Sequence, residues 1–545
     1  MGRRPERAGV SRQGLLVIVA TIAALTGPVD AVEADELAPP AVAAGDQAAD
    51  RFDIGEFRVL GNTKLDARIV EAAVYPFLGP GRTLHTVEDA RDALVAAYRA
   101  AGLGTVLVDI PEQAVDEGIV RLQVTEGRIE TVRIAGARYY SERKILARLP
   151  AVKAGEVPSL PALQAELGEL AAESRDREIT PVLKPGSEPG TLAVGLDVKD
   201  SLPLHASIES NNRYSADTTL TRLVATLSYE NMFQRAETLS LQYQTAPQKP
   251  SEVEVAAATY SGRTAVEGLG WSAYAIRSKS DVAAIGTLSV LGNGTIVGGR
   301  LNAVLAAGSG SVQSLSAGAD YKSFSQNVNL PGSVTDRTPI HYVIWTLQYS
   351  AARQGAHLDG QGSLGLSFAM RGLGTSDTDF EFNRSGAHAG FAYLRGNGSA
   401  NWHLWHDLTV GLRFAGQYTE QPLVTNEQFA LGGVDTVRGY LEAEALVDSG
   451  AAASLEIRTP QMRAGRFAGR LLAFYDRGVG LMQQPLGSEI ASGSVRTDLA
   501  SFGAGVRFNV DPNIDAIVNW AHPVRAGTHT PVGDSRVEFS LKLSY

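Results

Sequence analysis

The sequence contains no cysteine, and after residue 34 it contains no long apolar run. A protein without thiols cannot be held together by disulfides, so its secondary structure must carry its stability. A membrane-spanning helix needs about 18 or more consecutive apolar residues, and none is predicted after residue 34. Hydrophobic residues make up 44 % of the chain and are spread thinly, as in strands that are polar on one face. The formal net charge of −10 argues against a nucleic-acid partner.

Recognisable patterns of catalytic or metal-binding residues are also missing. The sequence has no phosphate-binding loop and no motif around a nucleophilic serine, and its nine histidines are scattered. His403 and His406 stand close together beside Asp407, but a spacing of three on a strand does not point both rings to one side. The sequence therefore predicts no enzyme, no catalytic residue, no metal and no cofactor.

The amino terminus has the pattern of a secretory signal. Basic residues precede the apolar run Leu15–Leu25, which is too short to span about 30 Å of hydrocarbon. Small residues suited to cleavage follow at Ala31 and Ala34. We expect residues 1–34 to be a cleaved signal peptide and residues 35–51, which are rich in Ala, Pro and Asp, to be a linker.

Residues 52–127 have the pattern of a small α+β domain. A strand and a short helix come first, and a second helix is expected to begin at Thr86, with Asp89 placed as in a capping box. Two strands, Thr105–Ile110 and Gly118–Thr125, follow. The predicted order is strand, helix, helix, strand, strand.

Residues 128–200 repeat this order. The apolar stripe of the second helix in this unit consists of Leu160, Leu163, Leu167 and Leu170. Each unit has about 70 residues, which is small but enough for one core. Composition alone identifies them only as two similar α+β modules.

Residues 201–545 read as strand after strand, separated by Gly, Asn, Ser and Asp. In Thr238–Gln244 and Ser363–Met370, apolar and polar residues alternate, so one face is apolar and the other polar. At roughly 10 residues per strand, this length allows about 14 to 18 antiparallel strands, with 16 as our estimate. A soluble sandwich would need about three domains in a row, and no repeat of that length is visible. We therefore expect an all-β transmembrane barrel.

The carboxyl terminus supports this interpretation. Val537–Tyr545 alternates without a break and ends on an aromatic residue, as outer-membrane barrels usually do. The apolar residues of this predicted terminal barrel signal include Phe539, Leu541, Leu543 and Tyr545.

Two short motifs stand out within the predicted barrel. The first is a Gly-rich turn, Leu431–Tyr440, and the second is a strand end, Phe474–Gly478. The residues of interest are Val437, Arg438, Gly439 and Tyr440 in the first, and Phe474, Asp476 and Gly478 in the second. An arginine offers a planar fork of donors and stays charged, and an aspartate can accept two of them.

These features together resemble the two-partner secretion transporters, the TpsB family, which includes the ShlB/FhaC/HecB-type haemolysin secretion/activation proteins of the POTRA-plus-barrel superfamily. The resemblance covers nearly all of the chain after the signal. It implies two periplasmic POTRA domains, at 52–127 and 128–200, and a barrel of 16 strands in the bacterial outer membrane. In such proteins a sixth extracellular loop folds into the barrel. Here it would place Arg438 against Asp476 on the inner wall, as a latch.

The resemblance also implies a function and partners. The POTRA domains would bind an unfolded secreted protein, a TpsA-like exoprotein, and the barrel would pass it to the cell surface. The other implied partners are outer-membrane lipid, the barrel-assembly machinery during biogenesis and periplasmic chaperones. Alternative interpretations are an insertase of other outer-membrane proteins, a general porin, and a latch pair that only helps the barrel to fold.

Partner recognition is expected on the first module, because an extended chain can add to an exposed sheet edge through main-chain hydrogen bonds. The candidate residues are Thr105, Val106, Val108 and Ile110 of the edge strand, and Leu94 and Tyr98 of the adjacent helix. Their spacing also fits plain core packing, and this alternative stays open.

Overall fold

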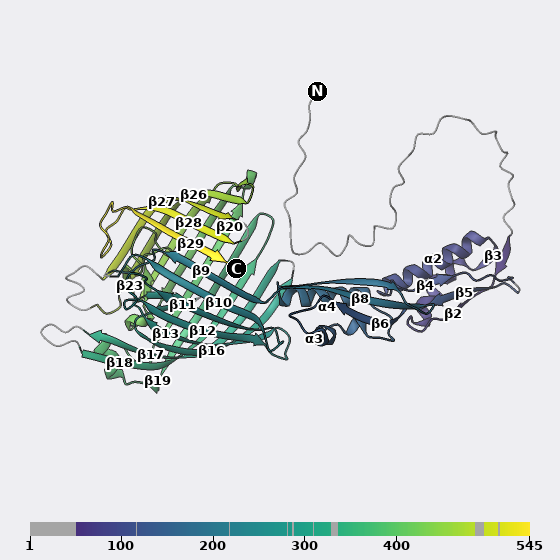
Figure 1. The fold of residues 1–545 in the computed structure, drawn as a ribbon, viewed down its shortest axis with the longest axis horizontal. Helices are drawn as coiled ribbons and strands as arrows, with labels where there is room; N and C mark the ends of the chain where they lie inside the picture. The colour runs from purple at the N-terminus through teal and green to yellow at the C-terminus, as the bar shows by residue number, and fades with distance from the viewer. Residues whose placement is uncertain are drawn as a thin grey trace, which may run out of the picture.

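The computed structural model places two α+β modules at one end of a closed β-barrel (Figure 1). It describes residues 51–545 except 116, 217, 281, 286–287, 309, 329–335, 486–494 and 511–512. The expected signal peptide, and the expected linker up to residue 50, lie outside the described residues. No helix within the described part of the chain is long and apolar enough to cross a bilayer.

The first module contains a three-stranded sheet in the order β2-β5-β4, with β2 parallel and β4 antiparallel to β5. Its elements are β1 (Phe52–Ile54), β2 (Glu56–Leu60), α1 (Ala67–Val74), η1 (Tyr75–Phe77), β3 (Gly79–Arg82), α2 (Leu84–Ala100), β4 (Leu107–Asp109) and β5 (Ile119–Thr125). The prediction that the second helix begins at Thr86 is wrong. Thr83 precedes its first turn, and the Thr83 N–H donates to the Thr86 hydroxyl at 3.5 Å, so Thr86 closes the capping box.

The candidate partner-binding residues of this module lie mostly in its core. The side chains of Leu94, Tyr98, Val106 and Val108 are buried in one cluster. Helical spacing on α2 and alternation through β4 turn these residues toward each other, so packing accounts for them. The strand is also shorter than expected, because Thr105, Val106 and Ile110 lie outside β4. A partner could still reach the main chain of β4, which lies at an edge of the sheet.

The second module repeats the architecture, with sheet order β6-β8-β7 and β6 parallel to β8. Its elements are β6 (Arg128–Ala135), α3 (Glu142–Ala147), η2 (Pro150–Val152), α4 (Leu160–Glu173), β7 (Arg177–Pro185) and β8 (Thr191–Asp200). Leu163, Leu167 and Leu170 are buried on α4, as their spacing predicts, whereas Leu160, the first residue of the helix, is only partly buried.

The barrel closes through 16 antiparallel strands, as expected, with β29 pairing with β9. They are β9 (Leu204–Asn211), β10 (Arg222–Met232), β11 (Glu237–Thr245), β12 (Glu254–Arg263), β13 (Leu269–Lys279), β16 (Gly294–Gly308), β17 (Ser311–Val328), β18 (Asp336–Arg353), β19 (Leu358–Gly374), β20 (Ala392–His403), β21 (Thr409–Tyr418), β24 (Ser449–Arg458) with its short continuation β25 (Met462–Ala464), β26 (Phe467–Leu481), β27 (Arg496–Val510), β28 (Ile514–Pro523) and β29 (Arg536–Ser544).

The connections distant from the modules carry the remaining elements. These are β14 (Val282–Ile285), β15 (Leu288–Leu291), α5 (Asp377–Asn383), η4 (Thr425–Glu427), β22 (Phe429–Leu431) and β23 (Ala445–Val447), whereas η3 (Trp405–Asp407) lies in a turn on the module side. The sixth connection at the distant end, residues 419–448 between β21 and β24, is called loop 6 below. Buried residues of loop 6 pack against the barrel wall, so it folds inward.

Candidate functional site

Arg438 of loop 6 is buried against the inner face of the barrel wall and is only 2 % exposed. Its Nε and Nη2 donate to the two carboxylate oxygens of Asp476 at 2.7 and 2.9 Å. Its Nη1 donates to Glu456 at 2.9 Å, and Nη2 also donates to the Ser454 hydroxyl at 2.9 Å. The main-chain N–H of Arg438 adds a bond to Asp476 at 3.1 Å. The structure thus places together the arginine and the aspartate that the sequence singled out.

Strand β26 presents the second motif on a single face. Because side chains alternate along a strand, Phe474, Asp476 and Gly478 all point into the barrel. The Arg438 guanidinium lies 3.4 Å from the centre of the Phe474 ring, a cation–π contact. A Cβ atom on Gly478 would lie 2.7 Å from Cγ2 of Val437, so the glycine makes room for the loop. Each residue of the motif therefore has a separate contact with loop 6.

The remaining residues of the loop motif fix the turn beside the wall. Gly439 has φ of +87°, which residues with a side chain rarely adopt, and its N–H donates to Glu538 at 2.7 Å. The Tyr440 hydroxyl lies 2.9 Å from the Ala500 carbonyl and 2.8 Å from the Arg525 carbonyl. Loop 6 is thus bound to β27 and β29 as well as to β26.

Sequence reasoning missed Glu456, the second acid of the site. Glu456 lies on β24 and also pairs with Arg458 and Arg507, the latter at 3.0 Å. Its inward position follows from the alternation of side chains along the strand. Which residues lie beside it on neighbouring strands depends on strand register, which cannot be read from the sequence. Removing one partner of such a buried network typically costs about 3–5 kcal/mol, whereas an exposed pair contributes about 0–1 kcal/mol.

Beneath loop 6 the barrel contains a polar cavity of about 790 Å³. Its wall includes Glu209, Gln242, Asn397 and Arg413 of the strands, and its cover includes Ala430 of the loop. The charged and amide side chains of this lining are suited to contact with water.

The other predicted site residues lie elsewhere. Phe539, Leu541, Leu543 and Tyr545 all point outward from β29 and its end, on the face that meets lipid. The partner-binding candidates are in the first module and do not contact the Arg438 site.

A further cluster joins the second module to the barrel. Ligand atoms of Asp176, His205 and Glu230 lie within 4.8 Å of one another, close enough for one metal ion to contact all three. The His205 Nε2 lies 2.9 Å from Asp176, and Arg175 pairs with Glu230 at 3.0 Å. Since both carboxylates already have protein partners, we interpret the cluster as a set of ion pairs that joins the second module to the barrel.

Modules of this α+β type before a closed barrel, with a loop bound inside it, define an outer-membrane protein of the POTRA-plus-barrel class. The family of haemolysin secretion/activation proteins ShlB/FhaC/HecB matches residues 190–508, and the ShlB-type POTRA domain matches residues 52–127. The chain belongs to this family of outer-membrane transporters. The barrel therefore lies in the outer membrane and the POTRA modules in the periplasm, as the resemblance predicted.

Named relatives agree with this assignment. The outer membrane transporter CdiB of Dickeya dadantii is 22 % identical over 410 residues, covering 72 % of this chain and 69 % of its own. The structure of CdiB from Escherichia coli matches with a TM-score of 0.58 at 17 % identity, covering 93 % of both chains. BamA from Haemophilus ducreyi lacking POTRA domains 1–3 matches with a TM-score of 0.55 at 12 % identity, covering 91 % of this chain and 100 % of that one. At these identities, the structural matches show the fold alone.

Proposed function

We propose that this transporter exports a partner protein in two steps. The POTRA modules bind the unfolded partner in the periplasm, and the barrel then passes it to the cell surface. The observation that supports this proposal best is the position of loop 6, which covers a polar cavity inside a closed barrel and is bound there by side chains. A loop held by side-chain contacts can leave the lumen without breaking any strand of the barrel.

The chemistry of the latch, defined as the Arg438–Asp476 pair, is suited to release. Both groups are charged, so water can solvate each of them when the loop moves out. The bidentate geometry gives one defined closed position, because two parallel bonds fix the orientation of the guanidinium. The latch therefore favours a closed barrel without making closure permanent.

The first module offers a sheet edge to the partner. Strand β4 lies at the edge of its sheet, and the side chain of Leu107, its first residue, is 64 % exposed. Main-chain hydrogen bonds along such an edge make little demand on the sequence of the added strand. An unfolded chain fits this requirement. Folding of the partner outside the cell then gives transport its direction. Transport by this route requires no nucleotide.

The test is export of a co-expressed candidate partner, scored as partner in the medium per folded barrel. Arg438→Ala and Asp476→Ala are expected to change export by at least several-fold, because each removes one side of a buried pair. Arg477→Ala is the matched control, since Arg477 is the next residue on β26 and its pair with Asp498 is half exposed. Export equal to that of the control in both variants contradicts the latch. Insertion of other barrel proteins by the purified transporter would support the assembly-factor alternative.

A further inference from the structure

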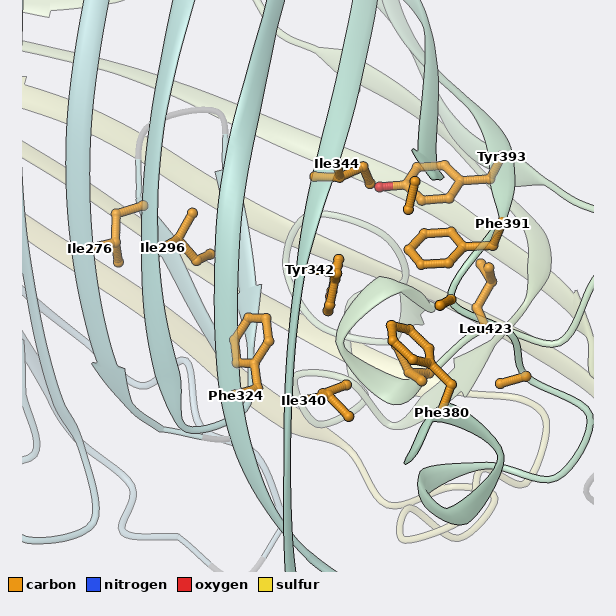
Figure 2. Packing of buried hydrophobic residues seen from close by; sticks show 14 of the residues in the cluster. Ile276, Ile296, Phe324, Ile340, Tyr342, Ile344, Phe380, Phe391, Tyr393 and Leu423 are labelled. Carbon is orange, nitrogen blue, oxygen red and sulfur yellow. The ribbon is translucent and has the colours of Figure 1, made fainter. Parts of the chain in front are cut away.

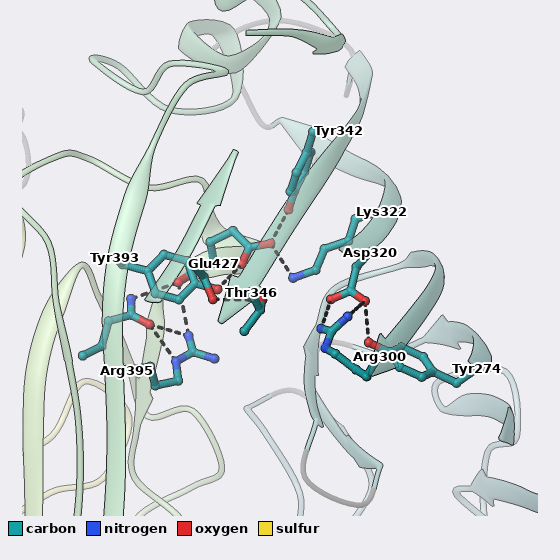
Figure 3. Close-up of polar contacts among 11 residues, drawn as sticks. Tyr274, Arg300, Asp320, Lys322, Tyr342, Thr346, Tyr393, Arg395 and Glu427 are labelled. Carbon is teal, nitrogen blue, oxygen red and sulfur yellow. Dashed lines mark hydrogen bonds and ion pairs between the residues drawn. The ribbon is translucent and has the colours of Figure 1, made fainter. Parts of the chain in front are cut away.

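Loop 6 carries several buried charges besides Arg438, and one of them is Glu427, at the end of η4. This side chain is 1 % exposed, and both of its oxygens are occupied. Oε1 accepts from Lys322 Nζ at 2.6 Å and from the Tyr342 hydroxyl at 2.5 Å, and Oε2 accepts from the Tyr393 hydroxyl at 2.8 Å (Figure 3). No residue of the two family motifs takes part in these contacts.

The partners of Glu427 come from a different part of the wall than those of Arg438. Lys322, Tyr342 and Tyr393 lie on β17, β18 and β20, whereas Asp476 and its neighbours lie on β24 and β26. These two groups of strands are separated by β21 in the barrel order. Loop 6 is therefore attached to two separate arcs of the wall.

Apolar packing supports the Glu427 attachment. Leu423 and Val424 of loop 6 are buried in a cluster with Phe380 of α5 and Phe391 (Figure 2). The ring of Tyr342 packs edge-on against both phenylalanines. The cluster holds the first part of loop 6, around Leu423 and Val424, against the barrel wall. The hydrogen bonds of the Glu427 carboxylate then fix its position there.

We propose that Glu427 forms a second latch, so that loop 6 leaves the lumen only when both the Arg438 and the Glu427 contacts have separated. The proposal rests on the proposed role of loop 6 as the closure of the channel. Glu427 and Lys322 carry opposite charges and meet only while the loop is inside. After separation water can solvate both groups, so this contact is reversible in the same way as the first.

The same wall provides a matched control in Asp320. This buried carboxylate accepts from Arg300 at 2.7 and 2.6 Å and also from the Tyr274 hydroxyl (Figure 3). Asp320, Arg300 and Tyr274 all belong to wall strands, namely β17, β16 and β13. Asp320→Asn therefore perturbs a buried acid of the wall without touching a residue of loop 6.

The absence of native cysteine allows a direct measurement of loop movement. Ala430 of β22 lies between the two latches and faces the cavity. In full-length Ala430→Cys transporter in outer membranes, a charged maleimide reports how often the loop exposes this position. Adding Glu427→Gln is expected to raise the labelling rate by about tenfold or more, a change that corresponds to roughly 1.4 kcal/mol. Adding Asp320→Asn is expected to leave the rate unchanged.

A second variant distinguishes loss of the Glu427 contacts from misfolding of the barrel. Tyr342→Phe with Tyr393→Phe keeps both rings in the cluster and removes only the hydroxyl donors to Glu427. It is expected to accelerate labelling in the same direction, with the heat-resistant barrel present in normal amount.

The two latches are separated by comparison with Arg438→Ala. Independent latches predict that Arg438→Ala with Glu427→Gln labels faster than either variant alone. If Glu427→Gln and the tyrosine variant both label at the rate of Asp320→Asn, the second latch is rejected, whatever Arg438→Ala does. If both accelerate labelling while Arg438→Ala leaves export unchanged, the second latch stands and the proposed role of the first fails.

Discussion

Gly478 shapes the site through the side chain that it lacks. It stands two residues after Asp476 on the same inward face, so its missing Cβ leaves room for Val437 beside the ion pair. The Phe-x-Asp-x-Gly motif thus combines a ring below the guanidinium, a charge beside it and a space next to both. At the residue scale, both size and charge contribute to the position of loop 6.

Gly478→Ala is expected to displace the loop, because the new Cβ would lie 2.7 Å from Val437 Cγ2. Overpacking of this kind costs about 1–3 kcal/mol. Labelling of the Ala430→Cys position should accelerate, and adding Val437→Ala should restore the original rate. Gly308→Ala on β16 is the control, since a Cβ there meets nothing within 4 Å. Failure of Val437→Ala to rescue would show that the clash is elsewhere.

In the periplasmic part, the single residue Glu126 binds the connection between β2 and α1 through hydrogen bonds. Burial alone would raise the pKa of this carboxylate, but hydrogen bonds from Thr63 and Lys64 outweigh burial and lower it. The Lys64 N–H donates to it at 2.8 Å, and Arg128 lies 3.6 Å away. Because the pKa is lower in the folded state, the carboxylate contributes stability above its unfolded pKa, and this contribution is lost as pH falls through the folded pKa.

Glu126→Gln is therefore expected to loosen the connection between β2 and α1 at neutral pH, by about 1.5–3 kcal/mol for bonds to a charged acceptor. Hydrogen exchange of the amides at residues 63–64 in the full-length protein measures this change. The difference from wild type should vanish in acid, below the folded pKa. Glu88→Gln, which changes an exposed acid on α2, should have no effect at either pH. A difference that persists in acid would assign the effect to packing.

At the scale of elements, loop 6 forms a separate structural unit inside the barrel. Its two short strands, β22 and β23, pair with each other and not with the barrel. Further along, Glu444 accepts from the Thr530 N–H at 2.8 Å, and Asp448 pairs with Arg384 at 2.8 Å. The loop is thus a separate hairpin, joined to the barrel and to neighbouring loops by side-chain contacts and by a main-chain bond from the Glu442 N–H to the Tyr214 carbonyl at 3.0 Å.

The last strand depends on the direction of its side chains. Leu541 of β29 faces lipid, and Ser540 faces the lumen beside Glu209 at 2.8 Å. Leu541→Lys is expected to reduce the yield of heat-resistant barrel, because a lysine on the lipid face is destabilising, by up to about 2–4 kcal/mol at the membrane centre. Ser540→Lys, one position away, is expected to be tolerated beside Glu209. Equal yields of the two variants would argue against the assigned faces.

At the scale of the whole molecule, the second module is fixed to the barrel by polar contacts. The turn between β10 and β11 contributes Gln234, which donates to the Tyr139 carbonyl at 2.8 Å and accepts from the Ser141 N–H at 2.9 Å. His205 of β9 pairs with Asp176 of the module. These contacts hold the second module at the periplasmic mouth of the barrel.

Deletion of residues 52–127 is expected to leave a heat-resistant barrel that no longer exports, because the contacts to the barrel come from the second module. The measurement is partner in the medium per folded barrel. Undiminished export by the truncated protein would reject a recognition role for the first module.

Much of the architecture could be predicted from local pattern. Alternation in segments such as Ser363–Met370 and Val537–Tyr545 indicated strands with one apolar face, and repetition of this pattern indicated a barrel. Helical spacing placed Leu163 and Leu167 in a core. The start of α2 was wrong because Thr83 and Thr86 are both good capping residues, and the geometry of the first turn chooses between them.

The two contacts that we propose as latches depend on tertiary structure. The family motif suggested Arg438 and Asp476 from the sequence alone. The contacts of Glu427 with Lys322, 105 positions earlier, and of Arg438 with Glu456 follow only from barrel closure and strand register. Side-chain period and polarity are local properties of a chain and can be read along it. Which charge meets which across a closed sheet is decided when distant strands come into register.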